Sequence, residues 1–244
     1  MAEDRLQPAK PLRMEWKTTF KVEVGVAPDN FTYTLYTDFF TRRSPFFNAA
    51  TSNTWSNGKT LVDLTDYTTD IFDAYLHFVY TKEISLKQPR SGLDGNDGSQ
   101  ADTDETAGQQ LAPLIRMYVL ADKLGDLSTA NSVMDELILQ SDEDKMIVST
   151  GCANDIYEHA AQGSPLRKLV LDWYVHDAGP IVDSAGLSQE VLEAIFQEYT
   201  TLRYQDYEAK GRGVKNGFHA SVSHMVASDK CRYHPHDNDH PRCT

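Results

Sequence analysis

The chain has 244 residues, of which 40% are hydrophobic and 10% aromatic, and this apolar content supports a buried core and excludes a fully disordered chain. The formal net charge of −13 repels phosphate backbones and anionic lipids, which argues against direct nucleic-acid binding and membrane docking. No stretch approaches the roughly 20 apolar residues of a membrane span, and the N-terminus lacks the apolar region of a secretory signal. We therefore expect an intracellular protein, in the nucleus or the cytoplasm.

The first predicted elements are two strands that form a hairpin. Residues 1–15 are interpreted as a flexible lead-in. Apolar and polar residues then alternate from Phe20 to Val24, which is typical of a half-buried strand. Turn-forming residues at 28–30 separate it from a second alternating run, so a β-hairpin is predicted. The side chains expected on one face of the second strand are Phe31, Tyr33 and Leu35.

Two helix starts follow the hairpin. Asp38 stands before a pair of phenylalanines and is interpreted as a helix N-cap, a common role for Asp, with a charged pocket residue as the alternative. At Ser44-Pro45 the Ser hydroxyl is expected to cap a helix, and Pro at the first helical position gives up no hydrogen bond. Phe46 and Phe47 should then be buried.

A short strand is predicted around Leu61–Leu64, followed by helices on both sides of an unusual segment. Residues 88–110 are polar and acidic with almost nothing to bury, and we interpret them as an acidic disordered insert. Gly125 is expected to end one helix and begin the turn to the next. Apolar residues at helical spacing predict three helices in this part, over residues 71–79, 114–124 and 127–138.

The C-terminal half is also predicted to be helical. Ser164-Pro165 repeats the cap-plus-proline start, and Ser188 precedes another amphipathic run. Three polar residues on these helices are interpreted as surface residues, because no nucleophile or catalytic motif accompanies them: His159, Asp172 and His176. The resulting division of the chain is a domain over 16–140, a helical extension over 141–205 and a polar tail over 206–244.

Several segments of the first domain occur in a characteristic order and spacing. They are Phe39-Phe40, Arg43 to Ala50, Trp55, Val62 to Leu64, Ile71-Phe72, Tyr75 to Ile84 and Leu114 to Leu127. Together they resemble the BTB/POZ domain family, in particular fungal BTB proteins. The resemblance implies an α+β fold, in which a small sheet is flanked by a cluster of helices whose surfaces bind other proteins.

The resemblance also bears on partners. Members of the family self-associate, recruit cullin-type ubiquitin ligases or act in transcription, and the resemblance implies no catalytic residues. Asp38 and Arg43 are the candidate partner-binding residues, although a helix cap for Asp38 and a local ion pair for Arg43 are the favoured interpretations. Residues 1–15 look too short and too proline-broken for the N-terminal element that many dimeric members exchange.

The feature of the sequence that most suggests a metal site is a Cys/His cluster near the C-terminus. Cys231, His234, His240 and Cys243 form a Cys-x2-His-x5-His-x2-Cys pattern, and His236 is an alternative ligand. Thiolate and imidazole ligands at short spacing suit a tetrahedral zinc ion, which would be structural because the protein supplies all four ligands. A disordered polar tail is nevertheless the favoured interpretation of this segment, and a disulfide between the two cysteines is a third option that a reducing compartment disfavours.

The sequence therefore predicts a protein–protein interaction module that acts as an adaptor or scaffold; a ubiquitin-ligase substrate adaptor is one form that the family resemblance allows, although the sequence shows no cullin-binding signature. The alternative is a transcription-linked regulator whose C-terminal tail is stabilised by structural zinc. We do not expect an enzyme, since the sequence contains no nucleophile elbow, phosphate-binding glycine loop or zinc-protease motif.

Overall fold

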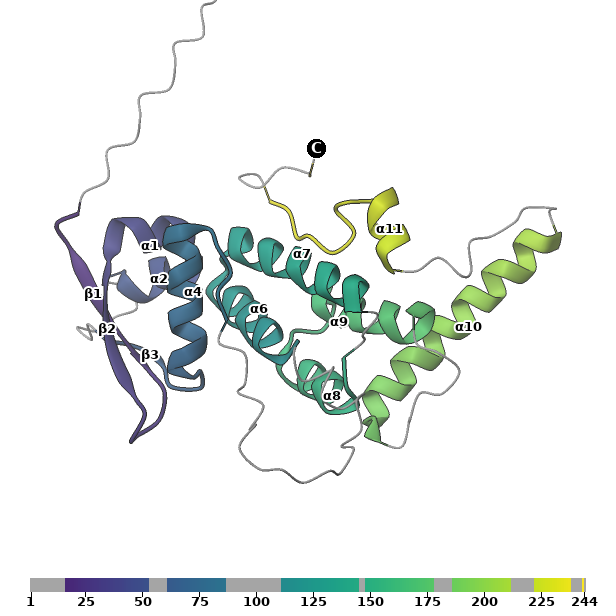
Figure 1. Cartoon of the computed structure of the whole chain (residues 1–244), viewed down its shortest axis with the longest axis horizontal. Helices are drawn as coiled ribbons and strands as arrows, with labels where there is room; N and C mark the ends of the chain where they lie inside the picture. Colours follow the sequence, from purple (N-terminus) through teal and green to yellow (C-terminus); the bar gives the residue numbers. More distant parts are fainter. Residues whose placement is uncertain are drawn as a thin grey trace, which may run out of the picture. The chain divides into compact units, whose positions relative to one another are not determined.

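The structure, a computed structural model, describes residues 16–52, 61–86, 111–144, 148–177, 186–211, 222–237 and 243. The protein is α+β, as expected, and divides into two compact units, Met1–Thr69 and Asp70–Thr244 (Figure 1). This division falls inside the predicted 16–140 domain. The parts of the sequence analysis outside the described residues are the lead-in at 1–15, Trp55, the insert at 88–110 and His240.

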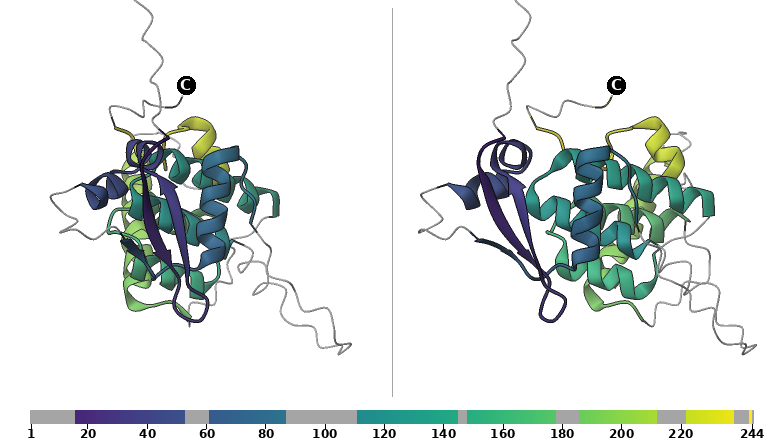
Figure 2. Two further views of the ribbon diagram at one scale, coloured as in Figure 1. Left: turned by 90° about the vertical axis from the view of Figure 1, so that its left-hand side faces the viewer. Right: turned by 60° about the vertical axis from the view of Figure 1, so that its left-hand side comes forward.

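The first unit is built on a three-stranded mixed sheet with the strand order β2-β1-β3 (Figure 2). The predicted hairpin is confirmed, because β1 (Thr19–Val24) pairs antiparallel with β2 (Phe31–Tyr36). The third strand, β3 (Leu61–Leu64), pairs with β1 in parallel. Alternation along β1 buries three side chains on one face, as predicted: Phe20, Val22 and Val24.

The second strand differs from its prediction. Of the three side chains expected on its buried face, Leu35 is buried, Tyr33 is half-buried and Phe31 is 58% exposed. Phe31 is the first residue of β2, next to the hairpin turn, whereas α1 begins at the other end of the strand. Its ring instead packs edge-on against Tyr33, with 4.8 Å between the ring centroids.

Two short helices follow β2, and the start of the second is as predicted. In α2 (Pro45–Thr51) the Ser44 hydroxyl accepts a hydrogen bond from the backbone N–H of Phe47 at 3.1 Å, and Pro45 occupies the first turn. Phe47 is fully buried against Phe20, with ring centroids 5.2 Å apart. Phe46 is only half-buried, so the expectation that both rings enter the core is wrong for this residue.

The interpretation of Asp38 as a helix N-cap is wrong. Helix α1 (Thr37–Arg43) begins directly after β2, so Tyr36 takes the N-cap position and makes no side-chain capping bond. Asp38 lies inside the first turn, where a negative charge is favourable to the helix dipole. Its carboxylate accepts a hydrogen bond from Arg42 Nη2 at 3.0 Å, an i, i+4 ion pair on the helix surface.

The second unit is a helical assembly (Figure 1). Its packed faces are apolar, and its core includes Tyr118, Leu137, Leu169 and Trp173, each at most 1% exposed. The elements are α4 (Thr69–Thr81), α6 (Ala112–Leu124), α7 (Leu127–Asp144), α8 (Thr150–His159), α9 (Pro165–Asp172), the π-helical turn η1 (Trp173–Asp177), α10 (Gln189–Gly211) and α11 (Val222–Ser228). In the described part of the chain, no helix is both long and apolar enough to cross a lipid bilayer.

The predicted helical hairpin of α6 and α7 is confirmed. Gly125 ends α6 with a φ of 68°, a left-handed conformation that favours glycine, and its N–H bonds back to the carbonyl of Asp122. The next residue, Asp126, caps α7 by accepting from the N–H of Thr129 at 3.1 Å. The sequence therefore encodes the turn with two adjacent local signals.

Asp126 also connects this hairpin to α4. Its carboxylate is 1% exposed and accepts hydrogen bonds from the Thr129 hydroxyl at 2.8 Å and the Tyr75 hydroxyl at 3.1 Å. A buried carboxylate is tolerated only when donors surround it. The contact between Asp126 and Tyr75 therefore fixes α4 against the α6–α7 turn.

The end of α9 is irregular. The helix continues past Asp172 into the π-helical turn of η1, where Trp173 is 1% exposed and the Tyr174 hydroxyl donates to the Val148 carbonyl at 3.0 Å. Single π-turns often mark functional positions in helices. Here the turn separates two aspartates by five residues, and both accept hydrogen bonds from the C-terminal part of the chain.

We expect Tyr75→Phe to lower the free energy of unfolding by about 1.5–3 kcal/mol, because it removes a hydrogen bond to a buried charged group while keeping the ring. Urea denaturation is the measurement. Tyr80→Phe is the control, since Tyr80 lies on the same helix and is 55% exposed. An equal loss in both variants would contradict the role of the buried bond.

Candidate metal centre

The C-terminal residues that the sequence grouped as metal ligands do come together in part. Cys231, His236 and Cys243 each offer a ligand atom, and these three atoms all lie within 4.8 Å of one another. His236, the alternative ligand in the sequence analysis, is therefore one of the three grouped residues. His240 lies outside the described residues.

The spacing of this group suits a metal ion held by sulfur and nitrogen. In a tetrahedral zinc site with bonds of about 2.3 Å to sulfur and 2.0–2.1 Å to nitrogen, neighbouring ligand atoms are about 3.5–3.8 Å apart. The backbone N–H of Cys243 donates to Cys231 Sγ at 3.1 Å, so the chain already folds one cysteine over the other. Cys231, His236 and Cys243 could accordingly hold a metal ion.

His234 is not one of these three residues, but it contacts one of them. Its Nδ1 lies 3.1 Å from Cys243 Sγ, and its Nε2 lies 2.9 Å from Asp135 Oδ1 on α7. The His234 side chain is only 8% exposed, whereas that of Asp135 is 64% exposed. The imidazole therefore bridges Cys243 and the surface of α7.

The electrostatic surroundings of the Cys243 thiol oppose its ionisation. Desolvation, followed by the hydrogen bond and the charge interaction with Cys231, raises the pKa of the Cys243 thiol above its ordinary value. Two thiolates close together repel each other, and a bound cation removes that repulsion. The arrangement therefore favours paired thiolates only when positive charge lies between them.

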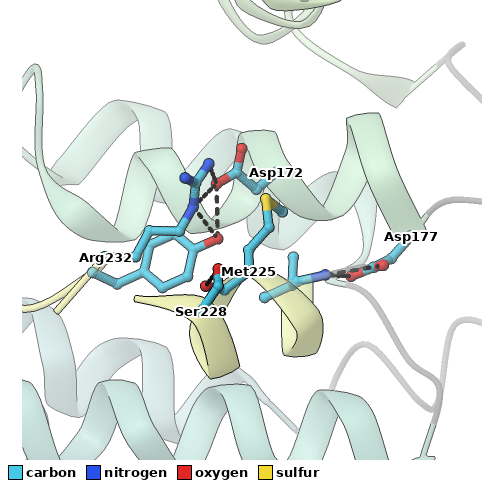
Figure 3. A network of polar contacts seen from close by, with 7 residues as sticks. Asp172, Asp177, Met225, Ser228 and Arg232 are labelled. Atoms are coloured by element: carbon cyan, nitrogen blue, oxygen red, sulfur yellow. Dashed lines mark hydrogen bonds and ion pairs between the residues drawn. The ribbon is translucent and has the colours of Figure 1, made fainter. Parts of the chain in front are cut away.

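The segment that carries these residues is anchored by one buried carboxylate (Figure 3). Asp172 Oδ2 accepts hydrogen bonds from the Tyr233 hydroxyl at 2.7 Å, Arg232 Nη2 at 2.8 Å and Arg232 Nε at 3.1 Å. The side chain of Asp172 is 2% exposed and that of Arg232 is 27% exposed. This is a largely buried ion pair with a third donor, a geometry that compensates the desolvation of the carboxylate.

The interpretation of Asp172 as a surface residue is wrong for this reason. The sequence placed it on an amphipathic helix near His159, and His159 is indeed exposed, with its Nδ1 2.9 Å from the Asp155 carbonyl oxygen. Asp172 instead faces the C-terminal segment. Its partners lie 60 and 61 residues further along the chain, so no local pattern could have identified them.

Further contacts hold the C-terminal segment before and after the residues that bind Asp172. The carboxylate of Asp177 accepts from the backbone N–H of Val222, the first residue of α11, at 3.2 and 3.3 Å (Figure 3). Asn131 on α7 donates to the Pro235 carbonyl at 3.4 Å. The predicted polar tail therefore contains a helix and a fully buried aromatic residue, Tyr233, which is 2% exposed.

The two candidate partner-binding residues, Asp38 and Arg43, belong to the first unit. Asp38 is half-buried and paired with Arg42, as described above, and Arg43 is half-buried in the last turn of α1. Their arrangement is that of a short charged helix surface. Surface ion pairs of this kind contribute little to stability, about 0–1 kcal/mol.

No family model matches the chain, and no curated protein matches it significantly. The residues that the structure describes are thus the basis for assigning a function.

We expect Tyr233→Phe to weaken the anchoring of the C-terminal segment in a way that depends on pH. Burial, followed by the charge of Asp172, raises the pKa of Tyr233 above its ordinary value of 10.0. A raised folded pKa means that the stabilisation by the neutral hydroxyl is complete below about pH 10 and decreases as the pH rises further.

Urea unfolding at neutral and alkaline pH measures this effect. At neutral pH the variant should be less stable than the wild type by about 1.5–3 kcal/mol, the value of a hydrogen bond to a charged group. The difference should shrink above about pH 10. A difference that stays constant across this range would contradict the assigned role of the hydroxyl.

Proposed function

We propose that the chain is a non-enzymatic protein-interaction module that acts as an adaptor or scaffold. The observation that carries this proposal is the surface of α10. This helix has 23 residues, and its far half extends beyond the helices α8 and α9 on which its beginning packs (Figure 1). Val191, near its start, is fully buried, whereas the apolar residues beyond it are largely exposed.

The exposed apolar residues of α10 lie on one side of the helix. Phe196 is 69% exposed, Tyr199 43% and Leu192 38%. Their spacing of three and four residues places them on one face, together with half-buried Ile195 and Leu202. Contiguous exposed apolar surface of this kind marks interaction sites, and aromatic residues contribute most to binding energy at such sites.

The charge around this apolar face indicates what it binds. Glu193 is exposed along one edge of the face, Arg203 lies at its far end, and the whole chain has a net charge of −13. Like charge disfavours a second copy of the chain as the occupant. The partner that fits is a protein with an amphipathic helix or apolar groove flanked by basic side chains.

The α+β architecture supports the same proposal. A small sheet together with many helices agrees with the fold that the BTB/POZ resemblance implies. On that basis the specific form of the function is a substrate adaptor of a cullin-type ubiquitin ligase. In it, α10 would carry one partner, and the helices or sheet edge of the BTB-like part would carry the other.

A second candidate is a transcription-linked regulator with a zinc-stabilised C-terminal segment. The convergence of Cys231, His236 and Cys243 favours it, since thiolate and imidazole ligands select zinc. The negative net charge points to action through protein partners rather than through direct DNA contact.

We expect Phe196→Ala to weaken binding to a synthetic amphipathic helix with a leucine face and lysine flanks by about 30-fold, which corresponds to about 2 kcal/mol at an aromatic anchor. Fluorescence anisotropy with the labelled peptide measures the affinity. Phe31→Ala is the matched control, because Phe31 is 58% exposed but lies on β2. Equal affinities of the wild type and both variants would contradict the proposal that α10 is the binding site.

A second peptide separates charge from apolar contact. The same sequence with glutamate in place of lysine should bind more weakly at low salt, and the difference should shrink as salt screens the charges. Affinity purification with mass spectrometry, comparing wild type with Phe196→Ala, then identifies the natural partner. Enrichment of a cullin supports the ligase adaptor, and enrichment of chromatin proteins supports the regulator.

A further inference from the structure

One contact links the metal centre to the rest of the second unit. His234 stands between Cys243 and Asp135, and its two ring nitrogens face opposite ways, Nδ1 toward the sulfur and Nε2 toward the carboxylate. Asp135 lies on α7, 99 residues away in sequence from His234. A histidine that binds a metal through one nitrogen almost always donates its other N–H to a carboxylate, a carbonyl or water.

We propose that His234 is the fourth ligand of a zinc ion held by Cys231, His236 and Cys243, and that Asp135 positions it from α7, so that zinc binding fastens the C-terminal segment to this helix. The proposal rests on the metal centre of the second candidate function and is independent of the α10 surface. It assigns a role to Asp135, a residue without any metal-binding pattern in its own part of the sequence.

The tautomer of His234 follows from the two contacts. A carboxylate only accepts hydrogen bonds, so the proton of a neutral imidazole belongs on Nε2, and Nδ1 keeps its lone pair. That lone pair faces Cys243 Sγ at 3.1 Å, slightly less than the spacing of about 3.5 Å expected between sulfur and nitrogen ligands of one zinc ion. A small separation of these two atoms makes room for the metal between them.

The strength of the contact between His234 and Asp135 depends on the metal. The side chain of Asp135 is 64% exposed, and an exposed pair of this kind contributes little by itself. When Nδ1 binds zinc, the ring orientation is fixed and its Nε2–H becomes a stronger donor to the carboxylate. Zinc therefore converts a weak surface contact into a persistent one.

The C-terminal segment is then held by contacts with two different helices. The Asp172 network holds Arg232 and Tyr233 on α9, and the zinc-bound His234 holds the following residues on α7. Directly after His234, the Asn131 side chain on α7 donates to the Pro235 carbonyl at 3.4 Å. Removal of zinc leaves the Asp172 anchor in place but releases the part of the segment that lies against α7.

Competition for zinc against a chromophoric chelator, with the purified full-length protein under reducing conditions, tests the ligand set. We expect one zinc ion per chain. Cys231→Ser and Cys243→Ser should abolish stoichiometric binding, and His234→Ala should weaken it at least tenfold. Cys152→Ser is the matched control, because Cys152 lies on α8 outside the cluster, and this variant should bind zinc like the wild type.

The role of Asp135 is tested by the same assay. Asp135→Asn should weaken zinc binding about 10- to 100-fold, the usual effect of losing an outer partner of a metal-bound histidine, and Asp135→Glu should restore part of it. Glu158→Gln is the control for net charge, because Glu158 is an exposed carboxylate on α8. An equal loss in Glu158→Gln and Asp135→Asn would overturn the positioning role.

Hydrogen exchange followed by mass spectrometry tests the fastening itself. With zinc, backbone amides of residues 234–237 should exchange more slowly in the wild type than in Asp135→Asn, and chelation should abolish this difference. Absence of zinc binding in the wild type would overturn both the metal centre and the fastening. Zinc binding that is unchanged in Asp135→Asn, or exchange that is unchanged on chelation, would overturn the fastening alone.

Discussion

The packing of the C-terminal segment onto the rest of the second unit depends on how the buried charge of Asp172 is compensated. The carboxylate of Asp172 is almost fully removed from water, and an ionised carboxylate in that position is tolerated only when donors surround it. Arg232 and Tyr233 supply three hydrogen bonds to a single oxygen. Loss of the charged partner, Arg232, would leave an uncompensated buried charge, at a cost of about 3–5 kcal/mol.

This constraint has consequences for the C-terminal segment. Because Asp172 must be compensated, residues 232 and 233 are held on α9, and the neighbouring Cys231 and His234 take fixed positions on either side of them. The π-turn after Asp172 brings Asp177 within reach of Val222, which fixes the start of α11. The ligand group is thus partly organised by contacts that involve no metal, and less conformational entropy is lost when a metal binds.

Much of the local structure could be predicted from the sequence, because the signals are local. The β-hairpin follows from alternation, and the helix starts at Ser44, Ser164 and Ser188 follow from capping side chains that accept the N–H bonds of the next turn. Gly125 ends α6 because its left-handed conformation favours glycine. The Cys/His spacing likewise identified the segment of the candidate site.

What the sequence missed depends on contacts between distant residues. The helical pattern around Asp172 predicts a surface residue. Asp172 is buried because Arg232 and Tyr233, which are distant in sequence, contact its carboxylate. Asp38 looks like an N-cap, but α1 begins at the end of β2, two residues earlier than an Asp38 cap requires. That His236 lies beside Cys231 and Cys243 depends on how the segment turns on α7 and α9, which spacing alone does not encode.

Zinc-edge X-ray absorption spectroscopy of the purified, reduced protein counts the sulfur and nitrogen neighbours of the metal and thereby tests the proposed ligand set. We predict two sulfur atoms at about 2.3 Å and two nitrogen atoms at about 2.0 Å, from Cys231, Cys243, His234 and His236. A first shell made of oxygen, or one with a single sulfur, would contradict this ligand set and with it the zinc-fastened C-terminal segment.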